Sequence, residues 1–159
     1  MYVQKRNNNN EIVSFDKILK RVKILGNECK PPLNINYTTL VMKIIEQLYN
    51  NISTSVIDEL TAQQCATMCT VHPDYTKLAG ILVISNLHKK TNSNFVEVMN
   101  NIYNFKDINN IHQPYLNDQF ITIVNNNSDY FNNLIQHNRD YFFDYFGFKT
   151  LEKSYLIKL

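Results

Sequence analysis

Apolar and polar residues recur with two different periods along this chain. In the segment Tyr2–Lys5, Val3 and Lys5 alternate with Tyr2 and Gln4, the polar run Asn7–Asn10 follows, and Ile12-Val13 lie beyond it. Single alternation on one side of an asparagine turn predicts a β-hairpin. From Ser14 onward, apolar residues recur at steps of three and four, which indicates amphipathic helices. The pattern therefore predicts a mainly helical chain that opens with a hairpin.

Four helices are expected before Thr91, and each has a recognisable start. Ser14 is suited to cap the first helix, Asn36 the second, and one of the three residues Ser53–Ser55 the third. Asp58 would then serve as a capping-box carboxylate, and Pro73 would open the fourth helix. The expected buried faces hold Ile18, Leu19, Val22 and Leu25; Leu40, Val41, Ile44, Ile45 and Leu48; Ile57, Leu60, Cys65 and Met68; and Leu78, Ile81, Leu82, Val83, Ile84 and Leu87. This order predicts an α+β fold, mainly α, in which the hairpin caps a four-helix bundle.

The composition changes near Thr91, and a division into residues 1–92 and 93–159 is predicted there. A helical extension is expected after the division, with a fifth helix over 95–102, an irregular segment over 106–116 and two shorter helices within 117–138. The tail from Arg139 is dense in phenylalanine and tyrosine. Such a cluster is either core against another part of the protein or a docking surface.

Charge and cysteine usage narrow the function classes. The chain has 159 residues and a net charge of +2, with scattered basic residues, which argues against a nucleic-acid partner. No apolar run approaches the ~20 residues of a membrane span, and the N-terminus does not resemble a signal peptide, so a cytoplasmic protein is expected. Cys29, Cys65 and Cys69 lack the paired spacing of a metal site, and Cys65 and Cys69, one helical turn apart, are interpreted as two small buried apolar residues in a reducing compartment. No metal site is predicted.

Four separate pieces of the sequence carry the chemistry: Lys5-Arg6, the segment Glu11–Ile18, the pair Thr54 and Asp58, and Lys89. A hairpin at one end of a bundle would bring them together, and cations beside helix ends suit a triphosphate. Each residue also has a plain structural interpretation. Lys5 and Arg6 are typical edge-strand charges, while Asp58 and Lys89 carry the signs favoured at the start and end of a helix.

A family resemblance strengthens the functional interpretation. The segments that carry it are Lys5-Arg6, Glu11–Ile18, His72–Tyr75, Ser85–Lys89 and Asp144–Leu156. Together they resemble the ATP-cone of class I ribonucleotide reductase large subunits of eukaryotic or viral type, followed by the lead-in to the catalytic barrel. The resemblance spans essentially the whole chain, and its most specific part is Asp144–Leu156.

The resemblance implies an allosteric role. The cone would bind ATP or dATP, with Mg²⁺ accompanying the triphosphate, and would set the overall activity of an oxidoreductase that makes deoxyribonucleotides for DNA synthesis. The implied partners are the remainder of the large subunit, further copies of that subunit and the small radical-generating subunit. Carried over by position, the nucleotide-binding residues are Lys5, Arg6, Glu11, Ile12, Val13, Ser14, Phe15, Asp16, Lys17, Thr54, Asp58 and Lys89. Lys5, Arg6 and Lys89 would meet phosphates, and Glu11 would accept a hydrogen bond from the adenine amino group.

The chain departs from the family pattern in its turn and in its cysteines. Asn7 and Asn8 stand where the family usually has Asp-Gly, and Asn92 stands where it often continues with a cation. Asparagine tolerates positive φ, so the hairpin is still expected. None of the three cysteines matches a catalytic cysteine, so this chain alone is predicted not to reduce nucleotides. Two alternatives stay open: a stand-alone nucleotide-sensing cone, or a helical protein-interaction module that binds no nucleotide.

Overall fold

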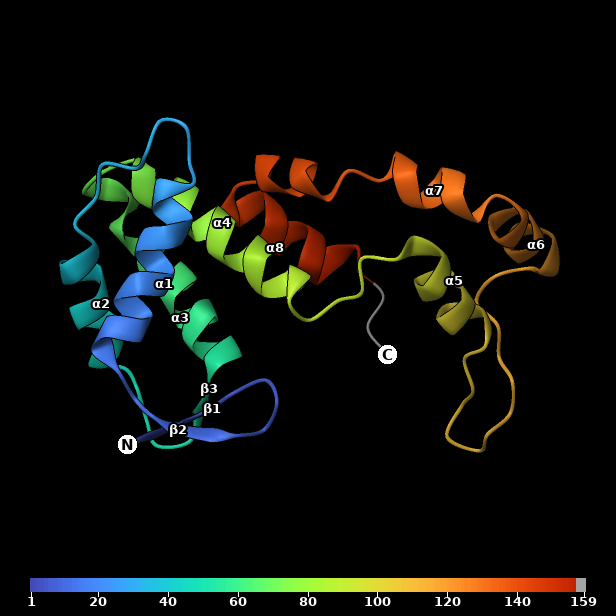
Figure 1. Ribbon diagram of the computed structural model, residues 1–159, viewed down its shortest axis with the longest axis horizontal. Coiled ribbons are helices and arrows are strands. Elements are labelled where there is room, and N and C mark those ends of the chain that lie inside the picture. The colour runs from blue at the N-terminus through green and yellow to red at the C-terminus, as the bar shows by residue number, and fades with distance from the viewer. Residues whose placement is uncertain (157–159) are drawn as a thin grey trace. The chain divides into compact units, whose positions relative to one another are not determined.

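The computed structural model describes residues 1–156, which fall into two compact units (Figure 1). The first unit comprises Met1–Leu87 together with the chain from Tyr141 onward. The second unit comprises His88–Asp140. Each unit has its own helices and its own buried residues.

The first unit opens with the predicted hairpin. Strand β1 (Tyr2–Gln4) pairs antiparallel with β2 (Asn10–Ile12), and Val3 lies opposite Glu11. Asn8 adopts φ 63°, the left-handed geometry that asparagine tolerates, so the hairpin forms without the family's glycine. A third strand, β3 (Ile52–Ser53), pairs parallel with β1 on the other side. This strand was not predicted, because two residues carry no detectable period and their pairing is long-range.

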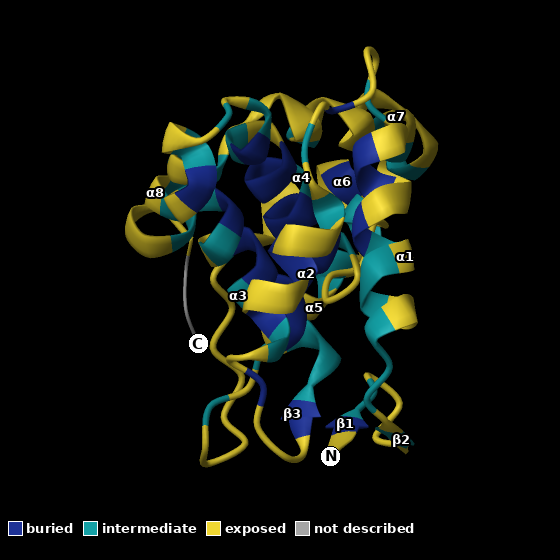
Figure 2. Ribbon diagram, turned by 90° about the vertical axis from the view of Figure 1, so that its left-hand side faces the viewer, coloured by how far each residue is buried: buried dark blue, intermediate teal, exposed yellow. Residues whose placement is uncertain are grey.

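The four predicted helices form the bundle behind this sheet. They are α1 (Phe15–Asn27), α2 (Tyr37–Ile45), α3 (Thr54–Thr67) and α4 (Asp74–His88), with a short 3₁₀ turn, η1 (Met68–Thr70), after α3. The sheet lies at the end of the bundle where α1 and α3 begin (Figures 1 and 2). The predicted hairpin-capped bundle is therefore confirmed.

Side-chain caps fix where the helices start. Ser14 Oγ accepts a hydrogen bond from the Lys17 amide at 3.4 Å, and Asn36 Oδ1 accepts one from the Thr39 amide at 3.0 Å. Among the three candidates for α3, Ser53 is the cap, since its Oγ accepts from the Val56 amide at 3.2 Å. Asp58 therefore lies too far along α3 to complete a capping box, and that prediction is wrong.

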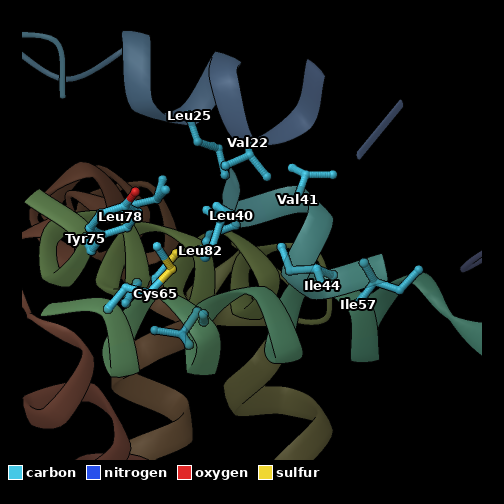
Figure 3. Packing of buried hydrophobic residues seen from close by; sticks show 14 of the residues in the cluster. Val22, Leu25, Leu40, Val41, Ile44, Ile57, Cys65, Tyr75, Leu78 and Leu82 are labelled. Carbon is cyan, nitrogen blue, oxygen red and sulfur yellow. The ribbon is translucent and has the colours of Figure 1, made fainter. Parts of the chain in front are cut away.

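The predicted apolar faces meet in one core (Figure 3). Helix α4 is buried almost all round, as its sequence indicated, and Leu78 and Leu82 are fully enclosed. Cys65 lies in this core, where burial raises the pKa of its thiol. Cys69 is only half-buried in η1, so the expectation of a second buried cysteine is wrong.

The aromatic tail returns to the first unit. Helix α8 (Tyr145–Ser154), capped by Asp144, places Phe148 in the same core. Lys149 of α8 forms ion pairs with Glu59 of α3 and with Glu152. Other tail residues remain exposed, among them Phe142 and Phe146. The tail is thus partly core, and a linear division at residue 92 does not describe the packing of α8 against the helices that precede it.

The second unit is smaller. It contains α5 (Phe95–Tyr103), α6 (Asp118–Asn126) and α7 (Ser128–Leu134), as the sequence predicted. Its buried apolar residues are Ile121 and Val124, and the loop between α5 and α6 carries one isolated bridge, Lys106 with His112. The 3₁₀ segment η2 (His137–Phe142) follows α7 and leads back toward α8. Over residues 1–156, no helix is long and apolar enough to cross a membrane.

Candidate functional site

An exposed cluster of three charges lies where the hairpin meets the start of α1. Glu11 Oε2 lies 2.8 Å from Lys5 Nζ, and Glu11 Oε1 lies 2.8 Å from Lys17 Nζ. The hydrogen bonds from Lys17 and then Lys5 lower the pKa of the Glu11 carboxyl from 4.5 to about 2. The carboxylate thus holds two cations from different elements at one place.

A second, deeper cluster surrounds Asp58 on the first turns of α3. Asp58 is buried, and its Oδ2 accepts from Arg6 Nη2 at 3.3 Å and from Arg21 Nη2 at 3.4 Å. Arg6 comes from the hairpin turn and Arg21 from α1, so three elements meet at one carboxylate. These distances exceed the 2.7–2.9 Å typical of charge-assisted hydrogen bonds, so Asp58 balances two charges with neither contact fully formed.

Helix α4 supplies two buried polar side chains that accept hydrogen bonds from the arginines of this second cluster. Asn86 Oδ1 accepts from Arg6 Nη2 at 2.5 Å, and Ser85 Oγ accepts from Arg21 Nη2 at 2.9 Å. Asn86 also exchanges two hydrogen bonds with Ser55, one to its carbonyl and one from its hydroxyl, both at 3.2 Å. Because Ser85 and Asn86 are themselves buried, their polar groups depend on these partners.

Sequence reasoning missed four members of this cluster: Arg21, Ser55, Ser85 and Asn86. One signal was available, since Ser85 and Asn86 interrupt a helix that is otherwise apolar nearly all round. A buried polar pair in such a helix needs a hydrogen-bonding partner. A second signal was the spacing of Lys17 and Arg21, which places both cations on one face of α1.

The structure brings five of the predicted residues into contact in two groups, Lys5 and Lys17 with Glu11, and Arg6 with Asp58. The others have different surroundings. Thr54 is the half-buried first residue of α3, Ser14 caps α1, Val13 and Phe15 pack against the core, and Ile12 and Asp16 are exposed. Lys89 belongs to the second unit, and its part in the site remains a prediction.

The two clusters share an excess of positive charge. Lys5, Arg6, Lys17 and Arg21 stand against the carboxylates of Glu11 and Asp58, beside the N-termini of α1 and α3. Helix N-termini add partial positive charge to that of the side chains. Such a surface suits a polyanionic ligand of small size. Within residues 1–156, no group of three or more His, Cys, Asp or Glu side chains is arranged to hold a metal ion.

Comparison with known families identifies the domain that contains both charge clusters. The family model described as "ATP cone domain" matches residues 1–90, which is more than half of the chain. The chain belongs to the ATP-cone family. The hairpin, the bundle and both charge clusters, up to Asn86 of α4, lie within the matched ATP cone.

The similarity continues beyond the cone. Over 160 aligned positions that cover the whole chain, the chain is 42% identical to the ribonucleoside-diphosphate reductase large subunit of Variola virus. It is 41% identical to the large subunit of Danio rerio and 41% identical to large chain 2 of Saccharomyces cerevisiae, again over the whole chain. The aligned part is the N-terminal region of those proteins. The chain spans about a fifth of their length: 21%, 20% and 18% respectively.

Proposed function

We propose that the ATP cone of this chain binds ATP or dATP at the hairpin end of its bundle, and that this binding regulates a ribonucleoside-diphosphate reductase. The observation that carries the proposal is the gathering of Lys5, Arg6, Glu11, Lys17 and Asp58 from three elements into adjoining charge clusters. A solvated edge-strand cation needs no such partners. The family match and the whole-chain similarity to reductase large subunits support the same conclusion.

The proposed roles follow the chemistry of each group. Lys5, Arg6 and Lys89 meet phosphate oxygens, for which ammonium and guanidinium groups are suited. Residues 11–17 line the adenine and ribose, Thr54 completes the pocket near the sugar and phosphates, and Glu11 accepts a hydrogen bond from the adenine amino group. A carboxylate oxygen has more than one lone pair, so Glu11 keeps this capacity beside its two lysines. Asp58 accepts from a ribose hydroxyl.

Mg²⁺ would accompany the nucleotide without a dedicated cage of side chains. The carboxylates of the clusters are engaged by lysine and arginine, and no metal-binding group of side chains is present over residues 1–156. Mg²⁺ commonly keeps several waters and binds through nucleotide phosphates. The residues described here therefore fit a cation carried by the triphosphate itself.

The proposed setting is a reductase large subunit in the cytoplasm. Residues 1–92 form the regulatory cone, and residues 93–159 lead toward a catalytic barrel that holds the reducing cysteines. The partners are the remainder of that subunit, further copies of it and a small radical-generating subunit. The chain described here would have no reductase activity by itself, since none of Cys29, Cys65 and Cys69 matches a catalytic cysteine of the family.

Titration calorimetry of the chain with ATP and dATP tests the proposal directly. Asp58→Asn should change the ratio of the two dissociation constants, because the nucleotides differ by one ribose hydroxyl and Asp58 is the proposed acceptor. One such hydrogen bond is worth about 0.5–1.5 kcal/mol, or up to about tenfold in affinity. The matched control is Asp129→Asn, which changes an exposed carboxylate in the second unit.

Binding of neither nucleotide would exclude the sensing role and favour a helical interaction module. An unchanged ratio in folded Asp58→Asn would show that Asp58 does not read the sugar, while leaving the nucleotide site itself intact. The control should leave both dissociation constants unchanged.

A further inference from the structure

The two buried polar residues of α4, Ser85 and Asn86, each accept a hydrogen bond from a different arginine. Ser85 contacts Arg21 and not Arg6, whereas Asn86 contacts Arg6 and not Arg21, among the hydrogen bonds of the described chain. Asp58 contacts both. Each guanidinium thus has one acceptor of its own on α4, and the two guanidinium groups share the Asp58 carboxylate on α3.

The way the arginines are held leaves part of each guanidinium unused. Over residues 1–156, all side-chain hydrogen bonds that Arg6 and Arg21 donate run through Nη2, although a guanidinium has five N–H donors. The side chains of Arg6 and Arg21 keep 33% and 26% of their surface exposed. The Nε atom of Arg21 is buried without a hydrogen-bond partner in the same range. Both cations are anchored by one nitrogen and are incompletely satisfied.

We infer that Arg21 is a further cation of the nucleotide site. Ser85 is the positioning residue for Arg21, and Asn86 is the positioning residue for Arg6. This inference rests on the proposed function. Asn86 fixes Arg6 at the hairpin turn, and Ser85 fixes Arg21 on α1. The remaining N–H groups of both guanidinium groups are then available to donate hydrogen bonds to the phosphate oxygens of a triphosphate. Phosphate oxygens then replace part of what Asp58 now supplies, since one carboxylate serves two cations at 3.3 and 3.4 Å.

Preorganisation is the physical reason that buried Ser85 and Asn86 matter for affinity. An arginine side chain that moves freely loses rotamer freedom when it binds an anion, and a held one has lost it already. Hydrogen bonds that hold Arg6 and Arg21 in the unliganded cone therefore strengthen phosphate binding. They do so without contact between Ser85 or Asn86 and the nucleotide.

A double-mutant cycle tests the inference. Asn86→Leu should raise the dissociation constant for ATP about tenfold, the effect of losing one hydrogen bond to a charged group. In an Arg6→Ala background the same change should have less than about a twofold effect, because the group that Asn86 positions is gone. The control Asn100→Leu removes an amide that bonds Val96 and Asn125 in the second unit, and it should leave the dissociation constant unchanged.

A second cycle guards against a variant that does not fold. Ser85→Ala deletes one oxygen in a helix that favours alanine, and it should weaken ATP binding only while Arg21 is present. Equal effects in the presence and absence of each arginine would show that Ser85 and Asn86 are merely structural, and unchanged affinity would equally overturn the inference. If the unmodified chain bound no ATP, the proposed function would fail and this inference with it.

Discussion

Glu11 shows how one residue acquires a role that its type alone does not specify. In the sequence it is a carboxylate after a turn, and in the fold it joins Lys5 of the hairpin to Lys17 of α1. The two lysines lower its pKa to about 2. The same side chain is therefore both a proposed contact to the base and an ionic link between two elements of the site.

The lowered pKa of Glu11 gives a prediction about acid stability. The folded chain holds this proton more weakly than the unfolded chain, so the stabilisation is present above pH 4.5 and is lost as the pH falls to about 2. We expect Glu11→Gln to lower the melting temperature slightly near neutral pH and to flatten the loss of stability across that acidic window. Thermal unfolding followed by circular dichroism over this range measures both effects.

The control for acid stability is Glu46→Gln, since Glu46 makes no ion pair within residues 1–156. It should leave the pH dependence of unfolding unchanged. Identical acid profiles for Glu11→Gln and the unmodified chain would mean that the two lysine contacts do not persist in solution.

At the scale of elements, the packing of the segment before α8 against α4 depends on a glycine. A Cβ atom at Gly80 would lie 2.9 Å from the Phe143 carbonyl oxygen and 3.3 Å from two backbone atoms of Asp144. Backbone cannot turn aside as a side-chain tip can. The missing side chain of Gly80 therefore lets the backbone of the segment that leads into α8 pack directly against α4.

Gly80→Ala should accordingly destabilise the chain, although alanine is normally the better helix former. We expect a loss of about 1–3 kcal/mol in the free energy of unfolding, typical of overpacking, measured by urea denaturation. Gly26→Ala is the comparison, because there the added atom meets the hydroxyl end of the Tyr37 side chain, which is able to rotate. A stabilised Gly80→Ala variant would show that Phe143 and Asp144 do not pack against Gly80 in solution.

Two residues of α2 separate burial from helix propensity. Ile44 is fully buried in the core, whereas Met42 on the same helix is 58% exposed. Ile44→Ala should cost about 2–5 kcal/mol through lost contacts and a cavity, and Met42→Ala within about 0.5 kcal/mol. Urea denaturation of both variants measures the difference, and equal losses would contradict the assignment of the buried face.

For the whole molecule, the proposal becomes a statement about assembly. ATP and dATP differ by one hydroxyl, and one hydrogen bond is too weak to act as a complete switch by affinity alone. We expect the two nucleotides to favour different packings of the cone and therefore different oligomers of the complete subunit. Size measurement of the complete subunit with each nucleotide tests this, with Arg6→Ala as a control that should respond to neither. Identical assemblies would contradict it.

The sequence by itself determined the hairpin and the helices α1 to α7 of this protein. The three- and four-residue periods and the caps Ser14 and Asn36 specify helices locally, and the asparagine turn specifies the hairpin, because these signals depend on near neighbours. The family was also legible from short motifs such as Lys5-Arg6 and Asp144–Leu156. The expected bundle also placed Lys5, Arg6, Glu11, Lys17 and Asp58 at its hairpin end, and their binding of a nucleotide stays a prediction.

Only the tertiary structure decided what those residues contact. The two arginines that bond Asp58 lie 52 and 37 positions away in the chain, and Asn86 accepts from Arg6 across 80 positions. The strand β3 and the return of α8 to the first unit have the same origin. No local period encodes such pairings, since they arise when separate faces are buried together and buried polar groups take the partners that packing brings near.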